Sequence, residues 1–217
     1  MKNRLIVGVV FATALLASAA IPLSGAQAAT VFSDNFNSDP QGLNTTPAGW
    51  NLTQGSVDII GTGFYAYLPL DIGNYIDLNG STSQYGGIGT ASPPFGAGTY
   101  TLTFDLAGNV VGPAYGDPNP KTTDISLGSW NKDITLNYND PLASYSYTFY
   151  TTGGSLAFSM EQNGNANIGN LLDNVTLSTV STTPLPSTWT MLIAGFVGLG
   201  FLAFRGTKKG AVAIAAA

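Results

Sequence analysis

Two aromatic residues, Trp130 and Tyr115, are the side chains in this sequence best suited to binding a ligand. Trp130 lies in a turn at residues 128–131, and Tyr115 lies in a Pro- and Gly-rich loop at residues 108–120. A ring exposed on a loop offers an apolar face on which a sugar can stack, beside amides or carboxylates that bind its hydroxyls. Either ring could instead fold back and cap the core, and we favour that second interpretation.

Among the acids, Asp173 is the main candidate for a metal ligand. It shares one face of a predicted strand with Leu171, Val175 and Leu177, and we expect this face to point to the core. A buried carboxylate needs a hydrogen-bond donor, a cation or a metal. Because few cations are nearby in the sequence, calcium is one interpretation. Backbone hydrogen bonds at the edge of the sheet are the other.

The residue types that are missing exclude several classes of site. The chain has no cysteine and no histidine. Disulfides, thiolate zinc sites, cysteine nucleophiles and Ser-His-Asp triads are therefore excluded, and any bound metal must be held by oxygen atoms. Glu161 is the only glutamate, and no pair of acids stands out for glycoside hydrolysis. We therefore expect that the protein is not an enzyme.

The charge distribution argues against nucleic acid as a partner. Residues 29–183 carry two lysines, Lys121 and Lys132, and all twelve acids of the chain, which gives a net charge of −10. Binding to phosphates needs clustered lysine and arginine. Four further acids have the spacing of no calcium loop, and we expect them to be solvated on the surface: Asp117, Asp124, Asp133 and Asp140.

Alternation with period two runs through residues 29–183 and predicts half-buried strands. At residues 99–106, for example, Tyr100, Leu102, Phe104 and Leu106 share one face. Glycine-rich turn signals separate about eight such segments, which predicts one all-β domain, an antiparallel jelly-roll β-sandwich. The other predicted strands are residues 57–60, 64–68, 75–78, 134–138, 145–149, 156–160 and 171–177.

The N-terminal residues have the pattern of a signal peptide. Lys2 and Arg4 precede an apolar run at residues 5–23, and Ala26 and Ala28 form a small-x-small cleavage site. This order of a basic start, an apolar stretch and small residues is typical of secretory signals. We therefore predict a signal peptide at residues 1–28, and mature protein from Ala29.

The C-terminal residues contain a second apolar run, at residues 190–204, which predicts a single transmembrane helix. A Pro-x-Pro-Ser-Thr-Trp motif precedes this run, small residues interrupt it, and basic residues follow it. The tail spans residues 184–209, and residues 210–217 extend it. Its marker residues are Pro184, Pro186, Ser187, Thr188, Trp189, Gly195, Gly198, Gly200, Arg205, Lys208 and Lys209.

This tail resembles the PEP-CTERM sorting signal of exported proteins in Gram-negative bacteria that make exopolysaccharide. The resemblance implies an inner-membrane intermediate, recognition by an exosortase, and delivery to the cell surface or the extracellular matrix. Leu185 stands where the signal usually has glutamate, a departure that bears on cleavage. The same tail is also catalogued at the C-terminus of certain ice-binding proteins.

The order of segments in residues 29–183 resembles the galactose-binding-like jelly roll of many carbohydrate-binding modules. The matching segments are residues 32–36, 49–50, 75–80, 98–105 and 171–177. In those modules an acid at the start of the last strand and ligands near the first strand hold one structural calcium. The resemblance implies that Asp173, Asp34 and Asn35 form this site here, with Asp39 as a further candidate.

Together these patterns predict an exported, non-enzymatic protein of the cell surface or matrix that contacts a polysaccharide or mediates adhesion. An inert structural matrix protein is the main alternative. An ice-binding protein and a glycoside hydrolase are the others, but the Thr101/Thr103 pair is isolated and no acid pair is visible.

Overall fold

The computed structural model describes residues 28–67, 72–91, 94–180 and 187–207. The chain divides into two compact units, one of residues 27–182 and one of residues 1–26 with residues 183–217. Every strand of the described residues lies in the first unit, and the described part of the second unit is the helix α1 (Ser187–Thr207).

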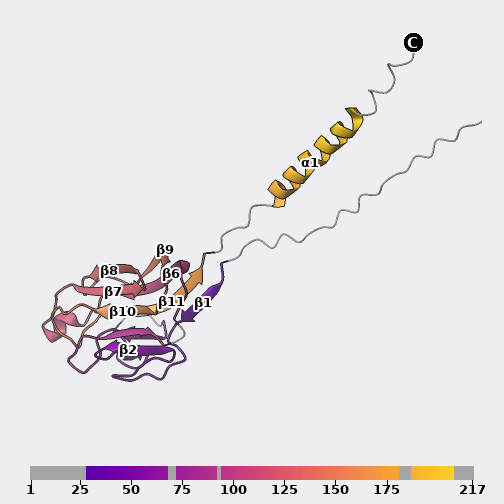
Figure 1. Cartoon of the computed structure of the whole chain (residues 1–217). Coiled ribbons are helices and arrows are strands. Elements are labelled where there is room, and N and C mark those ends of the chain that lie inside the picture. Colours follow the sequence, from indigo (N-terminus) through magenta and orange to yellow (C-terminus); the bar gives the residue numbers. More distant parts are fainter. Residues whose placement is uncertain (1–27, 68–71, 92–93, 181–186, 208–217) are drawn as a thin grey trace, which may run out of the picture. The chain divides into compact units, whose positions relative to one another are not determined.

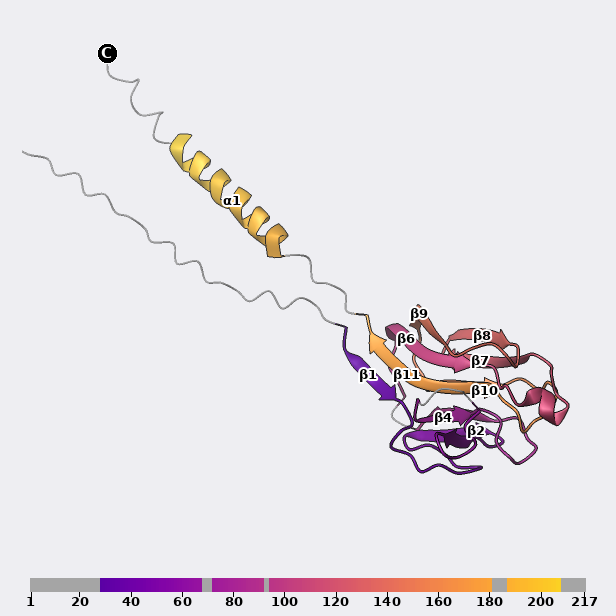
Figure 2. The same ribbon diagram turned by 180° about the vertical axis from the view of Figure 1, so that it is seen from behind.

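The first unit is a sandwich of two antiparallel sheets, which confirms the predicted all-β sandwich and is consistent with a jelly roll. One sheet has the order β3-β4-β11-β6-β9, with β1 paired to β11, and the other has the order β2-β5-β10-β7-β8. Figures 1 and 2 show β1 beside β11 from both sides. The strands are β1 (Thr30–Asp34), β2 (Trp50–Gln54), β3 (Asp58–Gly61), β4 (Asn74–Asp77), β5 (Gly87–Thr90), β6 (Gly98–Ala107), β7 (Lys121–Leu127), β8 (Trp130–Leu136), β9 (Ala143–Thr151), β10 (Leu156–Met160) and β11 (Leu171–Thr179).

The main core forms between the inner faces of the two sheets, as the alternation predicted. In β6 the side chains of Tyr100, Leu102, Phe104 and Leu106 are buried, while the intervening residues are more exposed. Phe158 of β10 meets Phe104 edge to face, with ring centroids 5.3 Å apart. Burial of such aromatic and aliphatic side chains is the main force that holds the two layers together.

A bulge in β11 moves Asp173 to the face opposite the one that was predicted. Leu172 pairs with Leu106 of the core, whereas Asp173 pairs with Asp105, and the register shifts between Asp173 and Thr176. Asn174 has a φ of 50° at this bulge, a left-handed conformation that asparagine tolerates well. Asp173 is buried as expected, but the extra residue breaks the strict alternation, so it does not share the core-facing side of Val175.

The predicted strand at residues 64–68 is wrong in its described part, residues 64–67. Phe64 forms only an isolated bridge with Gly61, and the following residues form a loop. Phe64 and Tyr67 pack on a second small cluster on the outer face of the sheet, made of Ile60, Tyr75, Ala107 and Leu171. The alternating apolar residues are thus explained by a loop that covers this cluster.

The predicted transmembrane helix must be corrected. Residues 187–207 do form the helix α1. Within the described residues, however, none of the helices combines the length and the apolar character needed to cross a membrane.

The predicted targeting residues fall partly outside the described residues. Ala28 is described and exposed, whereas Ala26 lies outside. Ser187, Thr188, Trp189, Gly195, Gly198, Gly200 and Arg205 belong to α1. The marker residues outside the described part are Pro184, Pro186, Lys208 and Lys209.

Candidate functional site

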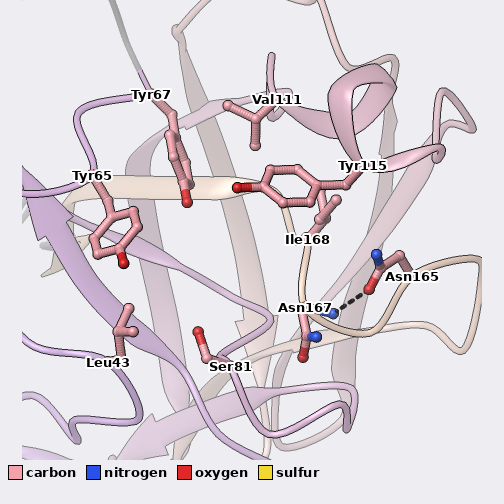
Figure 3. Close-up of a pocket in the computed structure, with 9 residues that line it drawn as sticks. All are labelled: Leu43, Tyr65, Tyr67, Ser81, Val111, Tyr115, Asn165, Asn167 and Ile168. Carbon is pink, nitrogen blue, oxygen red and sulfur yellow. Dashed lines mark hydrogen bonds between the residues drawn. The ribbon is translucent and has the colours of Figure 1, made fainter.

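A cavity of about 240 Å³ opens on the sandwich, and three tyrosines contribute to its wall. Most of its residues come from the loop after β3, from a short 3₁₀ helix at Gly112–Tyr115 with the residue before it, and from the loop that precedes β11. Leu43 comes from the segment between β1 and β2, and Ser81 from the segment between β4 and β5. Figure 3 shows these side chains around the opening. We call this site the tyrosine pocket, and it is lined by Leu43, Tyr65, Tyr67, Ser81, Val111, Tyr115, Asn165, Asn167 and Ile168.

Two of the tyrosines are exposed and the third is anchored. The side chain of Tyr65 is 49 % exposed and that of Tyr115 is 64 % exposed. Tyr67 packs on the second cluster and meets Tyr65 edge to face, with ring centroids 6.2 Å apart. Burial, followed by the nearby carboxylate of Asp77, raises the pKa of Tyr67 to about 12. Its hydroxyl therefore stays protonated at neutral pH and can donate a hydrogen bond.

Two asparagines form the polar side of the pocket. The Asn165 Oδ1 accepts the backbone N–H of Asn167 at 2.9 Å, a bond that Figure 3 shows. The Asn167 Oδ1 accepts the backbone N–H of Ser83 at 2.6 Å. Because its oxygen is engaged within the loop, Asn165 presents its amide nitrogen as the group that can donate to a ligand.

The buried Asp77 connects two segments that line the pocket, the 3₁₀ helix and the loop that precedes β11. It is 2 % exposed, and its Oδ1 accepts the backbone N–H groups of Gly169 at 2.8 Å and Asn79 at 3.0 Å. Its Oδ2 accepts Nδ2 of Asn109 at 2.8 Å. Burial raises the pKa of Asp77 well above its ordinary value, although these donors oppose the shift. Gly169 follows Ile168 and Asn109 precedes the 3₁₀ helix, so one buried carboxyl group positions both segments.

A buried ion pair makes a second connection between the same two segments. The Asp117 Oδ2 accepts Nζ of Lys121 and the backbone N–H of Asn165, and Lys121 Nζ also donates to the Asn163 carbonyl at 2.7 Å. Burial opposes ionisation of Asp117, but Lys121, the N–H of Asn165 and the side chain of Asn119 together lower its pKa to about 2. The expectation of a solvated Asp117 was therefore wrong.

The structure separates the two predicted stacking residues. Tyr115 lines the tyrosine pocket, whereas Trp130 does not. Trp130 is the first residue of β8 rather than part of the turn. Its ring stacks on that of Phe149, with centroids 3.8 Å apart and planes 9° from parallel, and also contacts Tyr147. One face of Trp130 is thus covered, as in a ring that caps the core.

Two of the residues predicted to hold calcium, Asp34 of β1 and Asp173 of β11, lie on neighbouring strands, and the third, Asn35, directly follows β1. Asp34 Oδ1 accepts the backbone N–H of Phe36 at 2.8 Å, and its Oδ2 accepts Nε1 of Trp50 at 2.7 Å. Asn35 is exposed, and its Oδ1 accepts the N–H of Asn37 at 3.3 Å. Asp34 pairs with Val175, two residues beyond Asp173. Each Asp34 oxygen thus already has a donor.

Asp173 itself has few donors and two acidic neighbours. Its side chain is 1 % exposed, and its Oδ1 accepts the backbone N–H of Asn174 at 2.7 Å. Burial raises the pKa of Asp173 to about 7, and the nearby Asp105 and Asp34 act in the same direction. The hydrogen bond from the Asn174 backbone N–H acts in the opposite direction. A buried carboxyl group in this setting is neutral or needs a cation.

The described part of the chain contains another group of acids, whose carboxylate groups lie near one another. Carboxylate oxygens of Asp124, Asp133 and Glu161 all lie within 4.8 Å of one another. Asp124 pairs with Asp133 across β7 and β8. Burial, Asp133 and Glu161 raise the pKa of Asp124 to about 6. The two-residue turn at Gly128 and Ser129 sets this pairing, so the sequence contained a signal for it.

Comparison with known proteins gives no family for this chain. No known family matches the sequence, and neither does any curated protein. Among solved structures, the K3 cleaved adhesin domain of Lys-gingipain from Porphyromonas gingivalis is 14 % identical, covers 71 % of this chain and 100 % of that chain, and has a TM-score of 0.46. CBM35 from Paenibacillus barcinonensis is 14 % identical, with coverages of 69 % and 99 % and a TM-score of 0.39. A family 35 carbohydrate binding module from Clostridium thermocellum is 12 % identical, with coverages of 58 % and 90 % and a TM-score of 0.34.

Proposed function

We propose that this protein is a non-catalytic module that contacts carbohydrate through the tyrosine pocket. The observation that carries the proposal is the combination of exposed rings, Tyr65 and Tyr115, with the amides of Asn165 and Asn167 at one opening. A sugar has apolar C–H faces and a rim of hydroxyls, so its binding needs aromatic faces and hydrogen-bonding groups together. The anchored Tyr67 supplies a hydroxyl donor beside them.

The composition of the pocket supports binding without catalysis. Glycoside hydrolysis ordinarily uses two carboxyl groups on either side of the scissile bond. The nine described residues that line the pocket include no aspartate or glutamate. The buried Asp77 lies behind the lining with both oxygens bonded to N–H groups of the protein. The pocket is therefore equipped to hold a sugar rather than to cleave one.

Replacing Tyr115 by alanine should weaken glycan binding by the full-length chain about tenfold, since a stacked ring contributes on the order of 1 kcal/mol beyond its buried area. Isothermal titration with neutral hexasaccharides, such as β-1,4-mannohexaose and cellohexaose, measures this change. Tyr150→Ala is the matched control, because Tyr150 is 66 % exposed on β9 and does not line the pocket. Equal losses in both variants, or no binding of any hexasaccharide by the native chain, would contradict the proposal.

We also propose a structural calcium ion at Asp173. The support is a buried carboxyl group with acidic neighbours and with no lysine among its hydrogen-bond partners. Asp34 and Asp105 are the adjacent acids that would share the ion. The group of Asp124, Asp133 and Glu161 is the competing position, because its oxygens approach one another closely. Thermal melts of Asp173→Asn and Asp124→Asn with calcium and with a chelator distinguish the two positions.

The sequence at the two ends supports a proposal about localisation. We propose export from a Gram-negative cell and recognition of the tail at residues 184–209 by an exosortase-type enzyme, with the cell surface or the matrix as the destination and exopolysaccharide as a partner. The support is the signal-peptide pattern at residues 1–28 and the tail motif. Mass spectrometry of the protein from cell-envelope fractions should find residues 1–28 removed. Recovery of the uncleaved chain from the cytoplasm would exclude export.

A further inference from the structure

Among the described residues, those that line the tyrosine pocket include no group that carries a full charge at neutral pH. Its polar groups are three tyrosine hydroxyls, the hydroxyl of Ser81 and the amides of Asn165 and Asn167. All of these can bond to sugar hydroxyls. Recognition of a carboxylate or a sulfate, by contrast, relies on arginine, lysine or several convergent N–H donors.

The cations of the sandwich are not at the pocket. Residues 29–183 contain only Lys121 and Lys132 as cations, and neither lines the pocket. Lys121 is buried, and its Nζ is occupied by Asp117 and by the Asn163 carbonyl. Lys132 is exposed on β8. No lysine of the sandwich is therefore placed to neutralise an anionic sugar in this pocket.

Acidic groups lie directly behind the lining. Asp58 Oδ2 accepts the hydroxyl of Ser81 at 2.7 Å, and Asp58 Oδ1 accepts the Ser81 backbone N–H at 3.1 Å. Asp77 accepts the backbone N–H of Gly169, the residue after Ile168. Asp58 and Asp77 are paired across β3 and β4 and both are buried. A negative group on a ligand would meet repulsion from the Asp58 carboxylate behind Ser81, weakly screened because this group is buried.

We propose that the tyrosine pocket selects neutral glycans and rejects glycans that carry carboxylate or sulfate groups. This selectivity rests on the carbohydrate-binding function proposed above. It follows from the uncharged lining among the described residues, from the position of both sandwich lysines away from the pocket, and from the buried Asp58 carboxylate behind Ser81. The pocket thus distinguishes between sugars by electrostatics as well as by shape.

A matched pair of ligands tests this selectivity on the full-length chain. β-1,4-Mannohexaose and the β-1,4-linked hexamer of mannuronate share linkage and stereochemistry and differ at C6, which is a hydroxymethyl group in one and a carboxylate in the other. Titration calorimetry at low salt should show at least tenfold tighter binding of the neutral hexamer. The difference should narrow at high salt, because added ions screen the repulsion. Cellohexaose and the hexamer of β-1,4-glucuronate form a second pair.

The possible outcomes test the preference for neutral glycans separately from carbohydrate binding itself. Equal or tighter binding of the acidic hexamer at low salt overturns the selectivity and leaves carbohydrate binding in place. Absence of binding by all four hexamers overturns both proposals. Preference for the neutral member in each pair supports both.

A charge added to the rim gives an independent test. Leu43 is 40 % exposed and lines the pocket. Leu43→Lys should tighten binding of the mannuronate hexamer several-fold at low salt, whereas Leu43→Gln, which adds a polar but neutral group, should not. Similar effects of both substitutions would show that charge does not govern the choice of ligand.

Discussion

Replacing Lys121 by methionine is expected to lower the free energy of unfolding by about 3–5 kcal/mol, because it leaves the buried Asp117 without its cation. The side chains of Lys121 and Asp117 are each 5 % exposed. Methionine fills a similar volume but cannot donate to Asp117 or to the carbonyl of Asn163. Thermal melting followed by circular dichroism should show a fall of roughly 10 °C.

The change at Lys121 should also affect the pocket. Asp117 and Lys121 hold Asn165 and Asn163 in the loop that forms the amide side of the site. Lys132→Met is the matched control, since Lys132 is exposed, and it should leave stability and glycan affinity nearly unchanged. Combining Lys121→Met with Asp117→Asn removes the uncompensated charge and should restore part of the stability. A melting temperature of Lys121→Met equal to that of the control would contradict a structural role for the ion pair.

In the presence of a chelator, Asp173 should make the protein less stable as the pH rises from about 4 to about 7. Its pKa is about 7 in the folded protein, against an ordinary value of 3.8. The folded state therefore holds this proton more tightly than the unfolded state, so the contribution of Asp173 is fully present below pH 4 and is lost on deprotonation. Each unit of pKa difference corresponds to about 1.4 kcal/mol.

The comparison that isolates this effect is between the native chain and Asp173→Asn. Urea unfolding with a chelator should show that the variant is the more stable protein at pH 8 and loses this advantage at pH 4. Asp105→Asn removes the acid opposite Asp173 and should reduce the pH dependence of the native residue. An unchanged pH profile in Asp173→Asn would contradict the assignment of the raised pKa to this carboxyl group.

Calcium should reverse the loss at high pH if it binds at Asp173. Binding only to the folded state stabilises by about 2.7 kcal/mol at a free calcium concentration 100 times the Kd. The melting temperature of the native chain at pH 8 should therefore rise with calcium, that of Asp173→Asn should not, and Asp124→Asn should keep the response. Loss of the response in Asp124→Asn alone would place the ion at the acids of β7 and β8, and no response in the native chain would exclude a calcium site.

The parts of the fold that could be predicted are those set by local alternation and short turns. Tyr100 to Leu106 in β6 and Leu156 to Met160 in β10 repeat every second residue, and their burial follows directly. The bulge at Asn174 could not be predicted, because one residue in a left-handed conformation reverses the faces without changing the apolar pattern. Asp173 therefore came out on the wrong face although its burial was predicted.

Only some of the residues that line the tyrosine pocket could be predicted from the sequence, for a similar reason. Tyr115 stood out because it lies in a loop rich in glycine and proline. Tyr65 and Tyr67 alternate with small or apolar neighbours and resembled a strand, whereas long-range packing on Ile60 and Leu171 makes that segment a loop. The pairing of Lys121 with Asp117 depends on the path of the loop between them, which local patterns do not specify.

Backbone amide spectra of the ¹⁵N-labelled full-length chain, recorded during titration with β-1,4-mannohexaose and cellohexaose, test the proposed binding site most directly. We expect the largest chemical shift changes at Ser81, Tyr115, Asn165 and Asn167, with Trp130 and β9 unaffected. Changes centred on Trp130, or spectra that do not change with either hexasaccharide, would contradict carbohydrate binding in the tyrosine pocket.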